Sequence, residues 1–261
     1  MFSRIGAEPS SEARAVELRG FRYYAIVMQL DARELDEFYE TAMGQVARRM
    51  ILRRLRLLWP ETGGCRILGF GFAVPYLRSF HSESERVVAL MPAQQGVIGW
   101  PDSRPLAALG EEDALPFPDA MFDRILVVHG LEGADAVRPV MRQLWRVLAP
   151  EGRMVIVAPN RASLWAQIER SPFAHGRPFH RGELDRLLRA SMFEPVKWDS
   201  ALYGPPLQGR RLVRTGTGWE RVGRRLWPRM AGVHLVEATK SLYAPVPVLK
   251  KKKTEPILAR A

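Results

Sequence analysis

The hydrophobic positions follow a helical spacing in three parts of the chain. From Asp31 the apolar residues recur at intervals of three, four and seven, which predicts one amphipathic helix that ends at Trp59-Pro60. Asp31 is a favourable N-cap, and Glu34 stands where its side chain can complete a capping box. The same spacing predicts helices at residues 137–148 and 182–191.

Short apolar runs without this spacing predict buried strands. Four runs alternate with the helices, and two more follow in the C-terminal third. The six runs are residues 67–72, 86–91, 123–128, 154–158, 196–198 and 233–238. This alternation favours an α/β fold with a doubly wound, mostly parallel sheet and helices on both faces. Pairing of the last two runs would place an antiparallel strand near one edge.

The two ends differ from this patterned region. Residues 1–28 contain Pro, Ser and scattered charges without a helix start, so we expect a poorly ordered N-terminal extension. The patterned domain takes residues 29–247, with a basic cap segment at about 205–231, and a basic tail follows at 248–261. No apolar run approaches the roughly 18–20 residues that span a bilayer, and residues 1–28 hold no secretory signal. A cytoplasmic protein without a transmembrane segment is therefore expected.

The charge of the chain allows two interpretations, anionic partners or solvated helix faces in an arginine-rich chain, of which the second is favoured. It has 39 Lys and Arg against 28 Asp and Glu, which gives a net charge of +11. The cap segment is rich in arginine, with interleaved tryptophans. Its candidate anion-binding side chains are Arg210, Arg211, Arg214, Arg221, Arg224 and Arg225. Three interpretations stay open: a solvated cap over an acceptor site, a surface for an anionic protein or lipid headgroups, and a nucleic-acid contact, which no RNA-binding motif supports.

Cysteine and histidine usage excludes two further classes. Cys65 is the single cysteine, so an intrachain disulfide and a Cys-rich zinc module are both excluded. His175 and His180 lie close together, but the Gly and Pro between them prevent a single helical face. We therefore expect no metal site there, and interpret this stretch as a loop over an active site.

Several motifs resemble one enzyme family. A strand, a Gly-x-Gly turn and a helix at Ile67–Leu77 form a unit that can cradle a ligand. Residues 110–126 (GEEDALPFPDAMFDRIL) and 144–152 (LWRVLAPEG) resemble motifs of class I S-adenosylmethionine (SAM)-dependent methyltransferases, in the type 11 group. Residues 182–194 resemble a later helix and strand entry of that group. The resemblance covers residues 31–245 and implies a seven-stranded, Rossmann-like sheet with SAM over the carboxyl ends of its first strands.

The resemblance also implies which positions hold the cofactor. These positions are Gly69, Phe70, Gly71, Ala73, Met91, Glu111 and Glu112. The first four would shape the methionine end of the cradle, and Met91 would lie near the ribose. Glu111 would accept from the adenine amino group, with Glu112 as its substitute after a small shift. His129, which follows a buried strand, would face the acceptor as a candidate catalytic base.

The chain departs from the family pattern at two acids. Gly69 stands where the family carries aspartate, and Leu90-Met91-Pro92 ends a strand run without a carboxylate. Losing two hydrogen bonds to charged groups weakens binding by about 10²- to 10⁴-fold. Three functions therefore stay open. They are SAM-dependent methylation of a small-molecule or lipid-like acceptor, regulation of a partner enzyme by an inactive methyltransferase-like protein that has lost SAM, and RNA methylation or binding.

Overall fold

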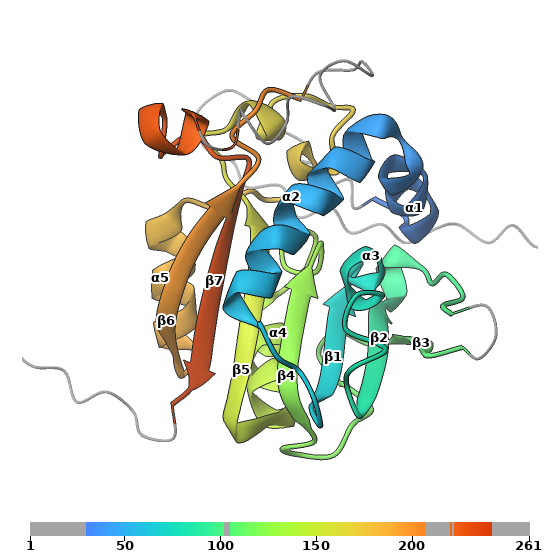
Figure 1. Ribbon diagram of the computed structural model, residues 1–261. Helices are drawn as coiled ribbons and strands as arrows, with labels where there is room; N and C mark the ends of the chain where they lie inside the picture. Colours follow the sequence, from blue (N-terminus) through green and yellow to red (C-terminus); the bar gives the residue numbers. More distant parts are fainter. Residues whose placement is uncertain (1–29, 102–104, 207–219, 221, 242–261) are drawn as a thin grey trace, which may run out of the picture.

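A seven-stranded sheet forms the centre of the protein (Figure 1). The computed structural model describes residues 30–101, 105–206, 220 and 222–241. The strands lie in the order β3-β2-β1-β4-β5-β7-β6. Their bounds are β1 (Arg66–Gly71), β2 (Arg86–Pro92), β3 (Ala107–Gly110), β4 (Phe122–Val128), β5 (Leu148–Pro159), β6 (Phe193–Ala201) and β7 (Val233–Lys240). Strands β1 to β5 pair in parallel, whereas β7 is antiparallel to both neighbours, β5 and β6. The predicted doubly wound, mostly parallel sheet with an antiparallel strand near one edge is thus confirmed.

Helices cover both faces of this sheet. The α-helices are α1 (Ala32–Glu40), α2 (Ala42–Leu58), α3 (Val74–Leu77), α4 (Val137–Val147) and α5 (Arg181–Ala190). Short 3-10 turns are η1 (Ala93–Gln95), η2 (Leu164–Ala166) and η3 (Pro172–Ala174). Because strand side chains alternate between faces, Ile67 packs with α1, α2 and α3, whereas Leu68 packs with α4 and α5. In Figure 1, α2 accordingly crosses in front of the sheet and α4 lies behind it.

The single helix predicted from Asp31 to Trp59 is wrong, because the chain breaks at Thr41. The Thr41 hydroxyl donates to the Phe38 carbonyl at 2.7 Å and accepts from the Gly44 amide at 3.0 Å, so it ends α1 and caps α2. A side chain at Gly44 would collide with Phe38, since its Cβ would lie 2.0 Å from that carbonyl oxygen. The predicted capping box is confirmed: Asp31 accepts from the Arg33 amide and the Glu34 carboxylate accepts from the Asp31 amide.

Two further features differ from the sequence-based expectations. The edge strand β3 was not predicted, because its apolar run, Ala107-Ala108-Leu109, is short and only partly buried. The helical spacing from Asp31 puts Arg54 opposite the apolar face and thus predicts it exposed, but it is 7% exposed and lies 3.8 Å from carboxylates of Asp199 and Glu220. It is buried because α2 packs against β6.

Part of the predicted basic surface lies outside the described residues. This holds for Arg210, Arg211, Arg214 and Arg221, for the extension at 1–28 and for the tail at 248–261. Arg224 and Arg225 are described and exposed. Within the described ranges, none of the helices has the length and apolar character needed to cross a bilayer.

Candidate functional site

The turns after β1, β2, β3 and β4 meet at one edge of the sheet, because parallel strands end together. The turn after β1 depends on Gly71, whose φ of 75° lies in the left-handed region. A Cβ there would lie 2.4 Å from the Val128 carbonyl oxygen. Gly71 therefore lets β1 turn close against β4, as the Gly-x-Gly motif predicted.

The position of the family's first acid is closed by packing. A Cβ on Gly69 would lie 2.4 Å from Leu77 Cδ1 and 2.8 Å from Ala73 Cβ. Phe70, the next predicted cradle residue, packs on the opposite face, in the core under α4 and α5. Met91 is fully buried in the core on the α1 side of the sheet. These side chains line the strand ends with hydrocarbon and offer no carboxylate there.

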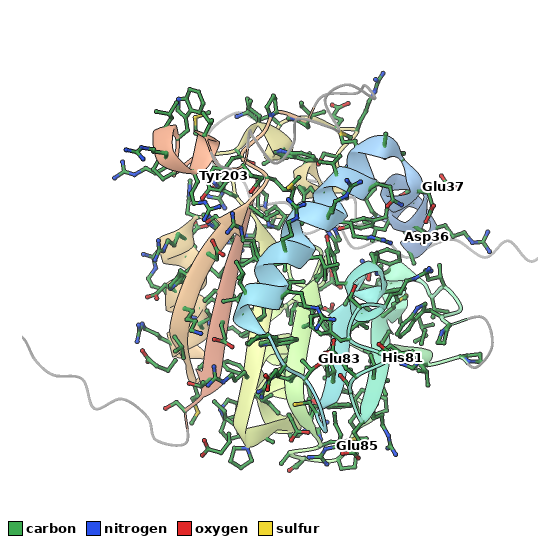
Figure 2. All side chains as sticks on the ribbon, viewed as in Figure 1. Asp36, Glu37, His81, Glu83, Glu85 and Tyr203 are labelled. Atoms are coloured by element: carbon green, nitrogen blue, oxygen red, sulfur yellow. The ribbon has the colours of Figure 1, made fainter. Side chains whose placement is uncertain are left out.

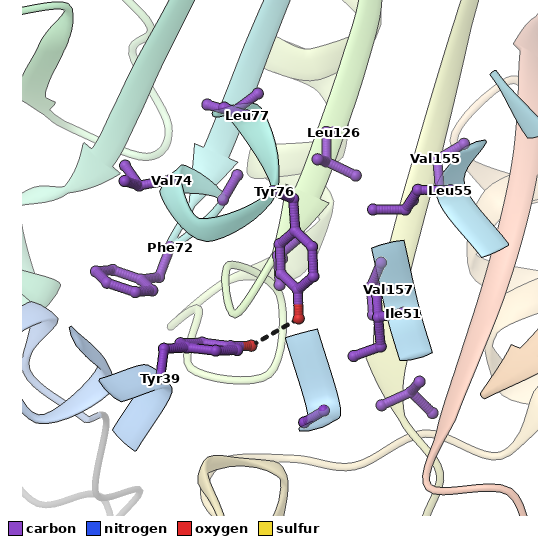
Figure 3. Packing of buried hydrophobic residues seen from close by; sticks show 14 of the residues in the cluster. Tyr39, Ile51, Leu55, Phe72, Val74, Tyr76, Leu77, Leu126, Val155 and Val157 are labelled. Carbon is purple, nitrogen blue, oxygen red and sulfur yellow. Dashed lines mark hydrogen bonds between the residues drawn. The ribbon is translucent and has the colours of Figure 1, made fainter. Parts of the chain in front are cut away.

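Aromatic side chains cover the turn after β1. We call Tyr39, Phe72, Tyr76 and His129 the aromatic cluster, and all four are buried. The Tyr39 hydroxyl lies 2.9 Å from the Tyr76 hydroxyl, and the Tyr39 ring stacks on Phe72 (Figure 3). The same hydroxyl lies 2.9 Å from His129 Nε2. Burial raises the pKa of both phenols above the ordinary value, so both are neutral. Helix α1 thereby closes the predicted methionine end of the cradle.

His129 lies at the end of β4, as predicted, but it is covered. Its Nδ1 lies 3.1 Å from Glu132 Oε1, and its ring packs against Phe173 at 5.1 Å between centroids. Glu132 accepts from Nδ1–H, which leaves the Nε2 lone pair to accept from the Tyr39 hydroxyl. A cavity of about 20 Å³, roughly the size of one water, lies beside this ring.

Two buried acceptors face the ends of β2 and β3 without a donor among the described residues. Gln95 donates through Nε2 to the His129 carbonyl at 2.9 Å, while its Oε1 has no partner. Glu112 accepts from the Asp135 amide through Oε1 at 3.2 Å, and the Ala136 amide also acts on this carboxylate, while no described donor meets hydrogen-bond geometry at Oε2. Burial raises the pKa of Glu112, although the two amides act to lower it. Glu111, the predicted adenine contact, is exposed.

Two larger cavities flank this edge. One, of about 690 Å³, lies between α1 and residues 169–175, and shares Leu30, Pro172 and His175 with the small cavity beside His129. The other, of about 520 Å³, lies between the start of α5 and the ends of β6 and β7. In Figure 2, Glu37 of the first cavity and Tyr203 of the second lie on opposite sides of the molecule.

Comparison with known proteins identifies the motif-bearing region. Residues 68–156 match the family described as "Methyltransferase domain". The match supports the resemblance of this region to the type 11 group of class I methyltransferases. Within this methyltransferase domain lie most of β1, all of β2, β3, β4 and α4, and Gln95, Glu112 and His129.

Relatives of the methyltransferase domain share part of their length with this chain. A malonyl-[acyl-carrier protein] O-methyltransferase of Halorhodospira halophila is 27% identical over 146 residues, which are 50% of this chain and 49% of the relative. A demethylmenaquinone methyltransferase of Deinococcus radiodurans is 32% identical over 71 residues, 26% of this chain and 30% of the relative. The chain thus matches half or less of the length of these curated relatives.

Solved structures support the same fold. A SAM-dependent methyltransferase of Thermotoga maritima superposes with a TM-score of 0.56 at 19% identity, and the match covers 80% of this chain and 95% of that one. At this identity the likeness shows the fold alone.

The residues at the β2 and β3 ends fit the adenosyl half of SAM. The adenine amino group and the ribose hydroxyls are hydrogen-bond donors, and Gln95 Oε1 and Glu112 Oε2 are buried acceptors without a donor in the described structure. The other half of the cradle is filled by the aromatic cluster and by Leu77. The sequence-based roles of all eight site residues stay predictions: Gly69, Phe70, Gly71, Ala73, Met91, Glu111, Glu112 and His129. Gln95 was not among the positions predicted from the sequence, although a polar residue follows the β2 run there.

We expect the stability of the protein to fall with acid because of one buried imidazole. Desolvation, with Arg181 and His180 nearby, lowers the pKa of His234 to about 4, whereas an unfolded histidine titrates near 6.5. Between these values the unfolded chain binds more protons, so the free energy of unfolding falls as pH decreases, by up to about 3 kcal/mol below pH 4.

Urea unfolding of the wild type and of His234→Leu from pH 4 to 7.5 checks this expectation. The difference in the free energy of unfolding between the two proteins should shrink or reverse as pH falls through this window. A constant difference would show that His234 does not titrate as described.

Proposed function

We propose that this protein binds SAM at the carboxyl ends of β2 and β3 and methylates a small-molecule or lipid-like acceptor. The observation that carries the proposal is the pair of buried acceptors, Gln95 Oε1 and Glu112 Oε2, inside the methyltransferase domain. The relatives named for malonyl-[acyl-carrier protein] and demethylmenaquinone support an acceptor of this class.

The chain's own residues would hold the cofactor from one end. Gln95 is fixed by its bond to the His129 carbonyl, and Glu112 by its bond from the Asp135 amide, so both acceptors are preorganised. When bound, SAM supplies a methyl group activated by its sulfonium. The surrounding core would keep water from the reacting groups.

His129 would take the proton that the acceptor loses. Glu132 orients the ring and leaves Nε2 as the basic atom. Tyr39 now lies 2.9 Å from that atom, so Nε2 becomes available when α1 and Tyr39 move aside. Glu132 would then stabilise the imidazolium.

The cavity between α1 and residues 169–175 would receive the acceptor. Phe38, Met43 and Pro172 give it apolar walls, while Glu37 and Arg170 add charged groups. Glu34 and Glu169 also line this cavity, so its apolar walls and several charged groups suit a small organic or lipid-like molecule that carries a polar group. It adjoins the small cavity beside His129, since the two share three lining residues.

A second candidate is an inactive methyltransferase-like protein that acts on a partner enzyme. The aromatic cluster over the Gly71 turn favours it, because the methionine half of SAM cannot enter while Tyr39 stacks on Phe72. The two candidates differ in one measurable property, the binding of SAM or its product S-adenosylhomocysteine (SAH).

Glu112→Gln is expected to raise the Kd for SAH about tenfold, because it removes the charge from a buried acceptor. Titration calorimetry measures this effect. Asp113→Asn is the matched control: it removes a neighbouring, exposed carboxylate and should leave the Kd within about twofold. Glu111→Gln tests the alignment-based alternative. If Glu111→Gln weakens binding and Glu112→Gln does not, the assignment of Glu112 is wrong.

A further inference from the structure

The cavity of about 520 Å³ has features of a binding site of its own. It lies beyond the end of β5, at Asn160, and is walled by β6, β7, the start of α5 and residues 228–229. It shares no lining residue with the cavities beside α1 and His129. A ligand here would therefore be separate from the proposed cofactor.

The two arginines that line this cavity have no carboxylate partner among the described residues. Arg181 lies over the Trp198 ring at 4.6 Å from its centroid, and neither Arg181 nor Arg229 has a carboxylate within ion-pair distance among the described residues. Asp199 also lines the cavity, but it already lies 3.8 Å from Arg54 of α2. The cavity thus holds two guanidinium groups against one carboxylate that is shared with a third.

A buried polar atom in the same wall also lacks a partner. His234, on β7 opposite Ser200, is 9% exposed, and no described atom hydrogen-bonds its Nε2. Leaving such a group unsatisfied is unfavourable, and a neutral imidazole can donate from Nε2 without adding charge. Its lowered pKa agrees with a neutral ring in the free protein.

We propose that this cavity binds the phosphate group of a small organic molecule, held by Arg181 and Arg229 with His234 Nε2 as a third donor. The donors come from three separate elements, which suits a tetrahedral group with several oxygens better than a planar carboxylate. The remaining volume, beside Trp198 and Tyr203, accommodates an aromatic or apolar body. This inference goes beyond the proposed function and does not rest on it.

Titration calorimetry with phenyl phosphate, in the absence of SAM, tests the proposal. The wild type should bind with a Kd below about 1 mM, and Arg181→Gln and Arg229→Gln should each raise the Kd about tenfold. His234→Leu should raise it about fivefold without changing the charge. Arg225→Gln is the matched control, since Arg225 is exposed and does not line the cavity, and it should leave the Kd unchanged.

Two other probes test the ligand class. Benzoate should bind at least about fivefold more weakly than phenyl phosphate if phosphate geometry is recognised, and inorganic phosphate should also bind more weakly because it lacks the body. Equal affinity for benzoate would overturn the phosphate assignment. Absence of saturable binding, or an equal loss in Arg225→Gln, would overturn the site. Because Arg229 is exposed, Arg229→Gln keeps the test valid if another variant fails to fold.

Discussion

Gly69→Asp is expected to destabilise the protein by about 3–5 kcal/mol, although it restores the residue that the family carries at this position. The added Cβ would lie 2.4 Å from Leu77 Cδ1 and 2.8 Å from Ala73 Cβ. The carboxylate would also be buried among apolar side chains, without a cation to pair with it. The close packing of α3 on β1 therefore leaves no room for an aspartate at position 69.

Urea unfolding and SAH titration together check this expectation. Gly69→Ala, which adds the Cβ without the charge, should cost about 1–3 kcal/mol, since the end of Leu77 can shift. In a Leu77→Ala background, Gly69→Asp should cost less than in the wild type, because the clash is relieved. A Gly69→Asp protein with unchanged stability and tighter SAH binding would contradict the packing described here.

Tyr39→Phe is expected to lower the free energy of unfolding by about 2–4 kcal/mol, although it removes a single atom. The Tyr39 hydroxyl bridges Tyr76 and His129 Nε2, so its loss leaves two buried groups without this partner. Tyr76→Phe is the matched comparison. It should cost about 1–2 kcal/mol, because the bond between Tyr39 and His129 remains.

The same pair of variants tests whether the aromatic cluster closes the cradle. If SAH must displace Tyr39, then weakening its bonds lowers the energy of opening, and the Kd for SAH should fall about fivefold in Tyr39→Phe. Denaturation measures the first effect and titration calorimetry the second. A Tyr39→Phe protein that keeps wild-type stability, or that binds SAH more weakly, would show that the cluster is not the barrier.

Periodicity and capping were sufficient to predict most of the fold. The apolar run at 123–128 predicted β4, and the spacing from Val137 predicted α4. The break at Thr41 was missed, because a hydroxyl there replaces backbone bonds within an otherwise continuous apolar pattern. Strand β3 was missed, because its apolar run of Ala107, Ala108 and Leu109 is too short to be distinguished from a loop, and as an edge strand it is only partly buried.

The candidate site was harder to predict than the fold. The motif resemblance favoured Glu111 as the contact of the adenine amino group. The turn after β3, however, leaves Glu111 exposed and directs Glu112 toward the Asp135 amide. Phe70 was assigned to the cradle, yet strand alternation directs it to the opposite face. The helical spacing predicts that Tyr39 faces the core, but only the tertiary packing of α1 brings its hydroxyl to His129. In each case the prediction failed on a tertiary contact of the side chain. The spacing of residues in a single sequence does not determine such contacts.

The central claim is that the adenosyl half of SAM binds at Gln95 and Glu112 while the methionine end is covered. Calorimetric titration of the wild-type protein with SAH, adenosine and methionine, each separately, tests it most directly. We expect SAH to bind with a Kd of about 10–500 µM, adenosine to bind within about tenfold of SAH, and methionine to give no heat up to about 5 mM. Binding of methionine without adenosine, or no binding of SAH at millimolar concentration, would contradict the account.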